Sequence, residues 1–152
     1  MLTITAIGAH PDDIEIFMYG VLAACRDRGD QINLIVATDG AAGGAEPGPE
    51  LACRRAGEAR DGLQHLGVPR LLDLPDGRLA ETGGAAGMVR EAIASTSPDL
   101  ILTHAPEDYH PDHRALSAMV ADAASFRCPL LFADTLMGVG FDPQFYVDIT
   151  PH

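Results

Sequence analysis

The stretch that decides the fold is residues 2–38, LTITAIGAHPDDIEIFMYGVLAACRDRGDQINLIVAT, in which two apolar runs flank an amphipathic segment. The first run, residues 2–9, ends shortly before Pro11, which disfavours a helical conformation in the residue before it. Apolar side chains then recur every three or four positions, which predicts a helix over 14–29. The second run, 31–38, indicates another buried strand, so the stretch predicts a strand, a helix and a parallel strand.

The same alternation continues along the rest of the chain. We expect strands at 70–74, 100–103 and 130–133, helices at 50–66, 87–95 and 113–125, and an edge strand within 141–151. This order predicts an α/β fold, a Rossmann-like three-layer sandwich in which helices cover both faces of a mostly parallel sheet. Ligands bind at the carboxyl ends of the strands in such folds, so we expect the site in the loops that follow the strands.

Length and charge exclude several functions. The chain has 152 residues, the usual size of one domain, so residues 1–152 are expected to form a single domain. Its 22 acidic residues exceed its ten basic ones and give a net charge of -12, which speaks against nucleic acid or an anionic membrane as a partner. All the basic residues are arginines, and the absence of lysine excludes Schiff-base and Walker-lysine chemistry.

Cysteine usage and hydropathy indicate a reducing compartment. Cys25, Cys53 and Cys128 lie far apart and form no CxxC pair, so we expect reduced core residues. The first apolar region carries acidic side chains that a signal peptide does not tolerate. No apolar run approaches the roughly 18 residues of a membrane span. The sequence therefore predicts a cytoplasmic protein.

The first group of chemically active residues is Ala9-His10-Pro11-Asp12-Asp13, at the tip of the first expected strand. Two adjacent carboxylates repel each other, and a bound divalent cation is an effective way to keep both ionised. The alternative is that Asp12 or Asp13 caps the helix that follows, which aspartate does well. The motif alone leaves both interpretations open.

The second group is His104 together with the segment 108–113, DYHPDH. His110 and His113 are three residues apart, and Pro111 suits the first position of a helix, so one helical turn can bring the two imidazoles together. The alternative is an acidic, solvated loop with surface histidines. His104 either supports the site or has a structural role in the core. The glycine-rich segment 39–49 is expected to be a loop or lid.

Together the two groups match the needs of a catalytic metal site. Such a site takes three nitrogen or oxygen ligands and keeps one position open for water. His10, one aspartate and one histidine of the second group supply that number. Neither group contains a serine, threonine or cysteine nucleophile, so a metal-activated water is the nucleophile that these residues offer. Hydrolysis is the expected class of reaction.

These motifs resemble those of the PIG-L/LmbE family of zinc-dependent N-acetylglucosaminyl deacetylases, which includes the mycothiol and bacillithiol pathway deacetylases. Residues 9–15, AHPDDIE, are similar to the family's AHPDDxE motif, and residues 110–113 are similar to its HPDH motif. Further similarities cover nearly the whole chain, at Thr38-Asp39-Gly40, Arg55 to Glu58, Leu66-Gly67-Val68, Leu74 to Gly77 and Val147 to Thr150.

The resemblance implies roles for eight residues. They are zinc ligation by His10, Asp13 and His113, catalysis by Asp12, His110 and Asp112, and substrate binding by Arg55 and Asp76. Asp12 would be the general base, and His110 would stabilise the oxyanion or protonate the leaving amine. Asp112 would orient the imidazole of His110, as carboxylates commonly do. Ferrous iron or another divalent metal is an alternative to zinc.

The sequence also departs from the family pattern. Residues 16–20, IFMYG, replace a stretch that usually reads Gly-x-Gly-Gly, and the family usually continues beyond Thr150, so the substrate pocket is expected to be short there or completed by a neighbouring subunit. We expect a hydrolase that removes the acetyl group from an N-acetylated amino sugar or sugar conjugate. The alternatives are an amidase acting on another small amide or a thiol conjugate, and a metal-binding module without turnover.

Overall fold

The computed structural model describes residues 1–134 and 140–152. Its strands are β1 (Thr3–Gly8), β2 (Gln31–Thr38), β3 (Arg70–Leu74), β4 (Leu100–His104) and β5 (Leu130–Ala133). They form one sheet in the order β3-β2-β1-β4-β5, and every neighbouring pair is parallel. The strands fall where the apolar runs predict them, and the α/β fold is confirmed.

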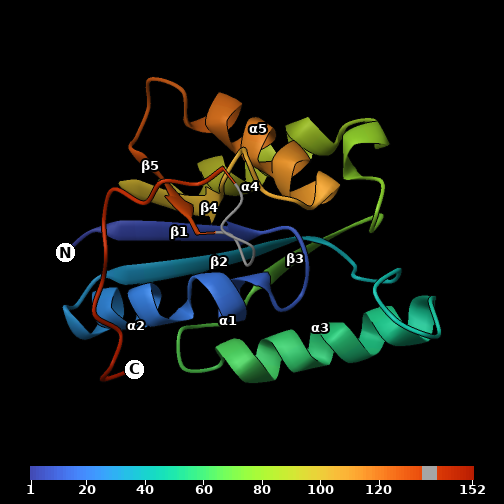
Figure 1. The fold of residues 1–152 in the computed structure, drawn as a ribbon, viewed down its shortest axis with the longest axis horizontal. Helices are drawn as coiled ribbons and strands as arrows, with labels where there is room; N and C mark the ends of the chain where they lie inside the picture. Colours follow the sequence, from blue (N-terminus) through green and yellow to red (C-terminus); the bar gives the residue numbers. More distant parts are fainter. Residues whose placement is uncertain (135–139) are drawn as a thin grey trace.

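Helices cover both faces of this sheet. They are α1 (Asp13–Phe17), α2 (Tyr19–Asp27), α3 (Pro49–Leu63), α4 (Ala85–Thr96) and α5 (Pro111–Ala124), with a short 3-10 helix at Leu79–Glu81. Helices α1, α2 and α3 lie on one face and α4 and α5 on the other, which gives the predicted three layers (Figure 1).

Two apolar cores separate these layers because side chains of a strand alternate between its faces. Ile4 of β1 packs with Ile14 and Leu22 on the face covered by α1, α2 and α3. Ile7 of the same strand packs with Leu116 on the face covered by α4 and α5. All five side chains are at most 1% exposed, so both faces of the central strand are closed to water.

The single helix predicted over 14–29 is wrong, because the structure divides this segment into α1 and α2 at Met18. The backbone of Met18 leaves the helical region, with φ of −128° and ψ of −17°. Ile14, Met18 and Leu22 nevertheless stay four residues apart and enter the same core. Apolar spacing is therefore preserved across the break, and periodicity alone does not reveal it.

The edge strand predicted within 141–151 is also wrong, because none of residues 140–152 joins the sheet. The segment packs against α2 instead: a Cβ atom added at Gly20 would lie 2.7 Å from Ile149 Cβ. Phe145 and Tyr146 point into solvent and are 75% and 85% exposed. The apolar residues of this segment therefore resemble a strand in composition without pairing as one.

The cysteines correct a further expectation. Cys25 and Cys128 are partly buried against the two cores, whereas Cys53 is exposed on α3, so the prediction of a core position is wrong for Cys53. Within residues 1–134 and 140–152, no helix is long and apolar enough to cross a membrane.

The chain order of the strands creates a crevice at one edge of the sheet. After β2 and β3 are laid on one side of β1, the chain returns and places β4 on its other side. In open α/β sheets, ligands bind at such a reversal, outside the carboxyl ends of the strands. His10 follows β1 and His104 ends β4, so both lie at this reversal.

Candidate metal centre

A tight turn after β1 positions the first two site residues. The backbone N–H of His10 donates a hydrogen bond to Asp13 Oδ2 at 2.6 Å, and the N–H of Asp13 donates to the carbonyl of His10 at 3.2 Å. Asp12 lies between them with φ of 115°, a conformation that is strained for a residue with a Cβ atom. Asp12 makes no side-chain cap of α1, so the helix-capping alternative has no support at this residue.

The side chains of His10, Asp13 and His113 meet beneath the crevice. We call them the three donor groups, because each can donate an electron pair to a metal ion. His10 Nδ1 lies 3.2 Å from His113 Nε2. Asp13 reaches the two nitrogens with different oxygens: Oδ2 lies 3.3 Å from His10 Nδ1, and Oδ1 lies 3.3 Å from His113 Nε2. Tetrahedral zinc with bonds of about 2.0–2.1 Å needs ligand atoms roughly 3.3–3.4 Å apart. All three residues are at most 7% exposed. The residues proposed from the sequence as metal ligands are therefore brought together at a spacing that fits a divalent cation.

The electrostatics of the three groups also suit a cation. Burial raises the pKa of Asp13, but hydrogen bonds from His10, His104 and His113 outweigh burial and hold that pKa well below its ordinary value. Burial lowers the pKa of His10 and of His113, yet neighbouring carboxylates raise both pKa values above the ordinary one. The site thus holds Asp13 ionised and favours positive charge beside it, which a bound metal ion also provides.

Buried partners hold His113 and Asp13 from behind. His104 Nε2 lies 3.1 Å from Asp13 Oδ2, and the His104 ring stacks on the His113 ring at 3.8 Å. His113 Nδ1 lies 3.1 Å from Asp108 Oδ2, a carboxylate only 2% exposed. A carboxylate behind a metal-binding histidine is a common way to fix the ring. Sequence reasoning left His104 open and missed Asp108, which no spacing rule distinguishes from the acidic residues around it.

Asp112 occupies a different place from the predicted one. Its carboxylate accepts hydrogen bonds from the N–H groups of Gly77 at 2.7 Å and Leu79 at 3.0 Å. Asp112 Oδ2 also lies 3.4 Å from His10 Nε2, and Asp76 Oδ1 lies 3.1 Å from the same nitrogen. The two carboxylates therefore face the ring of His10, whereas the prediction placed Asp112 behind the ring of His110.

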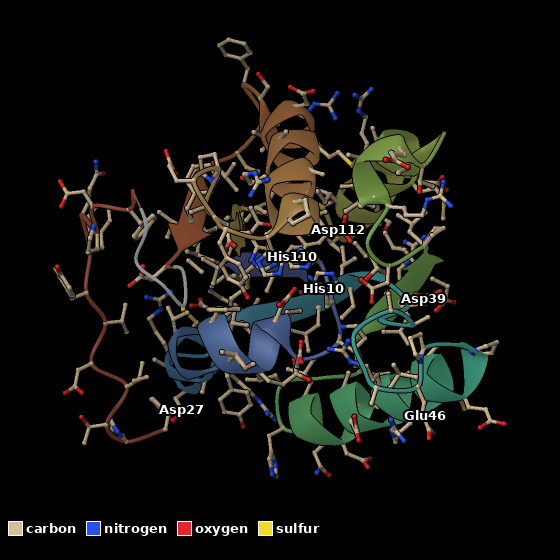
Figure 2. The ribbon with its side chains drawn as sticks, turned by 45° about the vertical axis from the view of Figure 1, so that its right-hand side comes forward. His10, Asp27, Asp39, Glu46, His110 and Asp112 are labelled. Atoms are coloured by element: carbon tan, nitrogen blue, oxygen red, sulfur yellow. The ribbon has the colours of Figure 1, made fainter. Side chains whose placement is uncertain are left out.

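His110 is oriented by a backbone group. It is the N-cap residue of α5, and its Nδ1 accepts a hydrogen bond from the N–H of Asp112 at 3.2 Å. A neutral imidazole that accepts at Nδ1 carries its proton on Nε2, so His110 can donate from that atom. Burial lowers the pKa of His110, and the nearby rings of His10 and His113 lower it further. Figure 2 shows His10, His110 and Asp112 converging at the centre of the molecule.

Asp12 and Arg55 form a pair at the rim. Arg55 Nη2 donates to Asp12 Oδ2 at 2.8 Å and to the carbonyl of Pro11 at 2.7 Å, while Nη1 donates to the carbonyl of Gly40 at 3.2 Å. Burial raises the pKa of Asp12 and the guanidinium of Arg55 offsets part of that rise, so the net pKa is above the ordinary value. Half of the Asp12 side chain is exposed, so it is accessible from the crevice.

The glycine-rich loop is fastened beside this pair. Asp76 Oδ2 accepts a hydrogen bond from the N–H of Ala42 at 2.9 Å. A Cβ atom at Gly43 would lie only 2.5 Å from Arg55 Nη1, so a side chain at this position would displace the guanidinium. A cavity of about 230 Å³ lies between this loop, α1 and the start of α5, and the three donor groups line it. The arrangement combines a candidate cation site, an accessible carboxylate and an imidazole that can donate a hydrogen bond around one open space.

Fold and site together define a parallel α/β protein with a candidate His/Asp metal centre at the carboxyl edge of its sheet. A family model described as PIG-L, GlcNAc-PI de-N-acetylase, matches residues 5–124. The chain belongs to this family, as the resemblance in the sequence predicts.

Individual relatives are similar over most of the chain. Diacetylchitobiose deacetylase from Thermococcus kodakarensis is 30% identical, over 97% of this chain and 63% of that protein, so the chain spans less than two thirds of its length. The conserved protein TT1542 from Thermus thermophilus is 27% identical with a TM-score of 0.82, over 99% of this chain and 73% of that chain. GalB, the 4-carboxy-2-hydroxymuconate hydratase from Pseudomonas putida, is 16% identical with a TM-score of 0.80, over 99% of this chain and 74% of that chain. At this identity the likeness shows only that the two proteins share a fold.

Proposed function

We propose that the protein is a metal-dependent N-deacetylase that hydrolyses the acetyl amide of an N-acetylated amino sugar or sugar conjugate. The observation that carries the proposal is the set of three buried side chains of His10, Asp13 and His113 beneath a cavity. The two histidine nitrogens lie 3.2 Å apart, and each lies 3.3 Å from a different carboxylate oxygen of Asp13. Membership of the PIG-L family and the name of the Thermococcus relative support the choice of substrate. Zinc is the proposed metal, with ferrous iron as the alternative.

The reaction adds water across an amide. The C–N bond breaks, a C–O bond forms, and the products are acetate and the free amine. A divalent cation, when bound, lowers the pKa of water and polarises the amide carbonyl. Asp12 is accessible at the rim and takes the proton from the attacking water.

His110 and the rim residues complete the proposed assignment. His110 donates a hydrogen bond from Nε2 to the oxyanion, since its Nδ1 is occupied by the N–H of Asp112. The proton that Asp12 has accepted then leaves with the amine. Arg55 and Asp76 are the proposed partners of sugar hydroxyls, because both line the cavity and carry complementary hydrogen-bonding groups.

The experiment is to measure bound metal by elemental analysis and acetate release from a panel of N-acetyl sugars, other small amides and thiol conjugates. Asp12→Ala should abolish hydrolysis while retaining the metal, and Asp27→Ala, on the exposed end of α2, is the matched control. Cleavage of only non-sugar amides would favour the alternative amidase. A protein that binds no divalent metal, or that binds it without cleaving any amide, would overturn the proposal.

We also propose that residues 1–152 act as one domain, in the cytoplasm, on a small-molecule substrate. One sheet that extends from Thr3 to Ala133 supports the single domain. A homo-oligomer is proposed as a way to enlarge the pocket, and light scattering of the purified protein tests it. If the protein is a monomer under the conditions in which it hydrolyses the substrate, the proposal of a homo-oligomer is contradicted.

A further inference from the structure

The cavity above the donor groups has two chemically different sides. One side carries Arg55 and Asp76, a guanidinium and a carboxylate. The other side carries Ile16, Phe17 and Tyr109, which come from α1 and from the loop before α5. The hydrogen-bonding groups of a ligand are favoured on the first side, and apolar carbon is favoured on the second.

Phe17 lies deepest among the apolar side chains. It is partly buried and packs against the core on the α1 side of the sheet. Its ring meets the rings of His104 and His113 edge-on, with centroids 6.0 and 6.2 Å away. Ile16 is 61% exposed, and Tyr109 is 49% exposed with its ring 6.1 Å from His113. Phe17 therefore forms the floor of the apolar side, and the other two residues form its rim.

An N-acylated sugar, like the cavity, has one polar part and one apolar part. Its hydroxyl groups need donors and acceptors, while its acyl carbons need apolar contact, and the amide between them must reach the donor groups. We propose that the acyl group lies on the apolar side and that Phe17 restricts it to the length of an acetyl group. The inference rests on the proposed function, because it names the acyl class that the same site accepts.

The size of the cavity agrees with a short acyl group. Its volume of about 230 Å³ is below the roughly 300–1,000 Å³ of pockets that enclose drug-sized ligands. Extra methylene groups forced against the ring of Phe17 would overpack a side chain that His104, His113 and the core already hold. A smaller residue at position 17 removes that obstacle and leaves the polar side unchanged.

The test compares kcat/KM for N-acetyl-, N-propionyl- and N-butyryl-glucosamine with the zinc-loaded wild type, Phe17→Ala and Phe17→Leu. The wild type should prefer N-acetyl, and Phe17→Ala should raise the propionyl-to-acetyl ratio of kcat/KM by about tenfold and the butyryl-to-acetyl ratio by more, since a single methylene in an apolar pocket changes specificity by about tenfold or more. Phe17→Leu keeps an apolar side chain against the core and should shift the ratio in the same direction by less.

Phe145→Ala is the control, because Phe145 is 75% exposed and does not line the cavity, and it should leave the ratio unchanged. If the wild type cleaves no N-acyl sugar, the proposed function fails. If it cleaves N-acetylglucosamine but the ratio stays constant in both Phe17 variants, only the acyl inference fails. A uniform rise in KM for all three substrates would place the sugar against Phe17 and would also overturn the inference.

Discussion

Buried carboxylates have different partners at the two ends of the parallel strands. The amino edge is the side of the sheet where the strands begin, and the carboxyl edge is the side where they finish. At the amino edge, Asp30 accepts a hydrogen bond from the N–H of Leu2 at 2.8 Å and pairs with Arg28, so backbone and arginine satisfy it. At the carboxyl edge, Asp13 and Asp108 face imidazole rings instead. The difference shows that the first arrangement is complete by itself, whereas the second brings donor atoms to the spacing of metal ligands.

Incomplete hydrogen bonding supports the same contrast. Among the described residues, six side-chain atoms are buried without an aligned hydrogen bond, and three of them, His10 Nε2, His113 Nδ1 and Asp108 Oδ2, belong to the carboxyl edge. The other three are Glu15 Oε2, Asn33 Nδ2 and Ser117 Oγ. Buried polar groups are normally satisfied, because each unsatisfied one costs about 1–3 kcal/mol. Half of these unsatisfied atoms therefore gather in one cluster, around His10 and His113.

The largest expected effect comes from removing a donor at the carboxyl edge. His113→Ala should lower kcat/KM for the N-acetyl substrate by roughly 10³-fold, because a metal ion contributes several kcal/mol to the transition state. Elemental analysis should show a matching loss of bound metal. Full activity in a variant without metal would remove the distinction between the two edges.

The second-largest effect is expected on stability: removing the metal should lower the free energy of unfolding. Zinc at about 100 times its Kd should stabilise the folded protein by about 2.7 kcal/mol, if it binds only the folded state. Thermal unfolding of the chelated and zinc-loaded protein measures this. Asp30→Asn should show the same zinc-dependent shift as the wild type, and an equal shift in His113→Ala would contradict the proposed ligands.

Asp112→Asn sharpens the comparison within the carboxyl edge. The change weakens the negative charge beside His10 Nε2, and such partners typically contribute about 10–100-fold to metal affinity. Competition with a chromophoric chelator measures the affinity without any need for turnover. Asp122→Asn, on the exposed part of α5, is the matched control and should bind zinc as the wild type does.

The smallest effect is expected at the amino edge. The N–H of Leu2 and the guanidinium of Arg28 lower the pKa of Asp30 below 3.8. Its stabilising contribution is therefore present above pH 3.8 and is lost as pH falls through the folded-state pKa. The difference in unfolding free energy between wild type and Asp30→Asn should shrink from about pH 7 to about pH 3. A constant difference would show that Asp30 does not titrate with folding.

Much of this architecture follows from local sequence. The five apolar runs predict the strands because parallel strands buried on both faces require such runs. Asp13 and His113 were proposed as ligands through motifs whose internal spacing is short, and the fold needs only to bring the two segments together. The break at Met18 and the course of residues 140–152 depend on tertiary packing, which local periodicity does not contain.

The surroundings of the site were less predictable for the same reason. Asp112 is held by the N–H groups of Gly77 and Leu79, which are 35 and 33 residues away in the sequence. His104 contacts Asp13 across 91 residues. Neither contact produces a periodic pattern in the sequence. Only the folded structure therefore shows that Asp112 faces the ring of His10.

The left-handed turn at Asp12 has a practical consequence for trapping complexes. Among the described residues, three other non-glycine residues have positive φ, all between 48° and 58°, whereas Asp12 is at 115°. Glycine at this position would relieve the strain and delete the carboxylate in one step. The change also deletes the hydrogen bond that Arg55 donates to Asp12. An Asp12→Gly protein should therefore keep the turn while leaving a bound amide intact, which makes it a suitable scaffold for capturing the unreacted ligand.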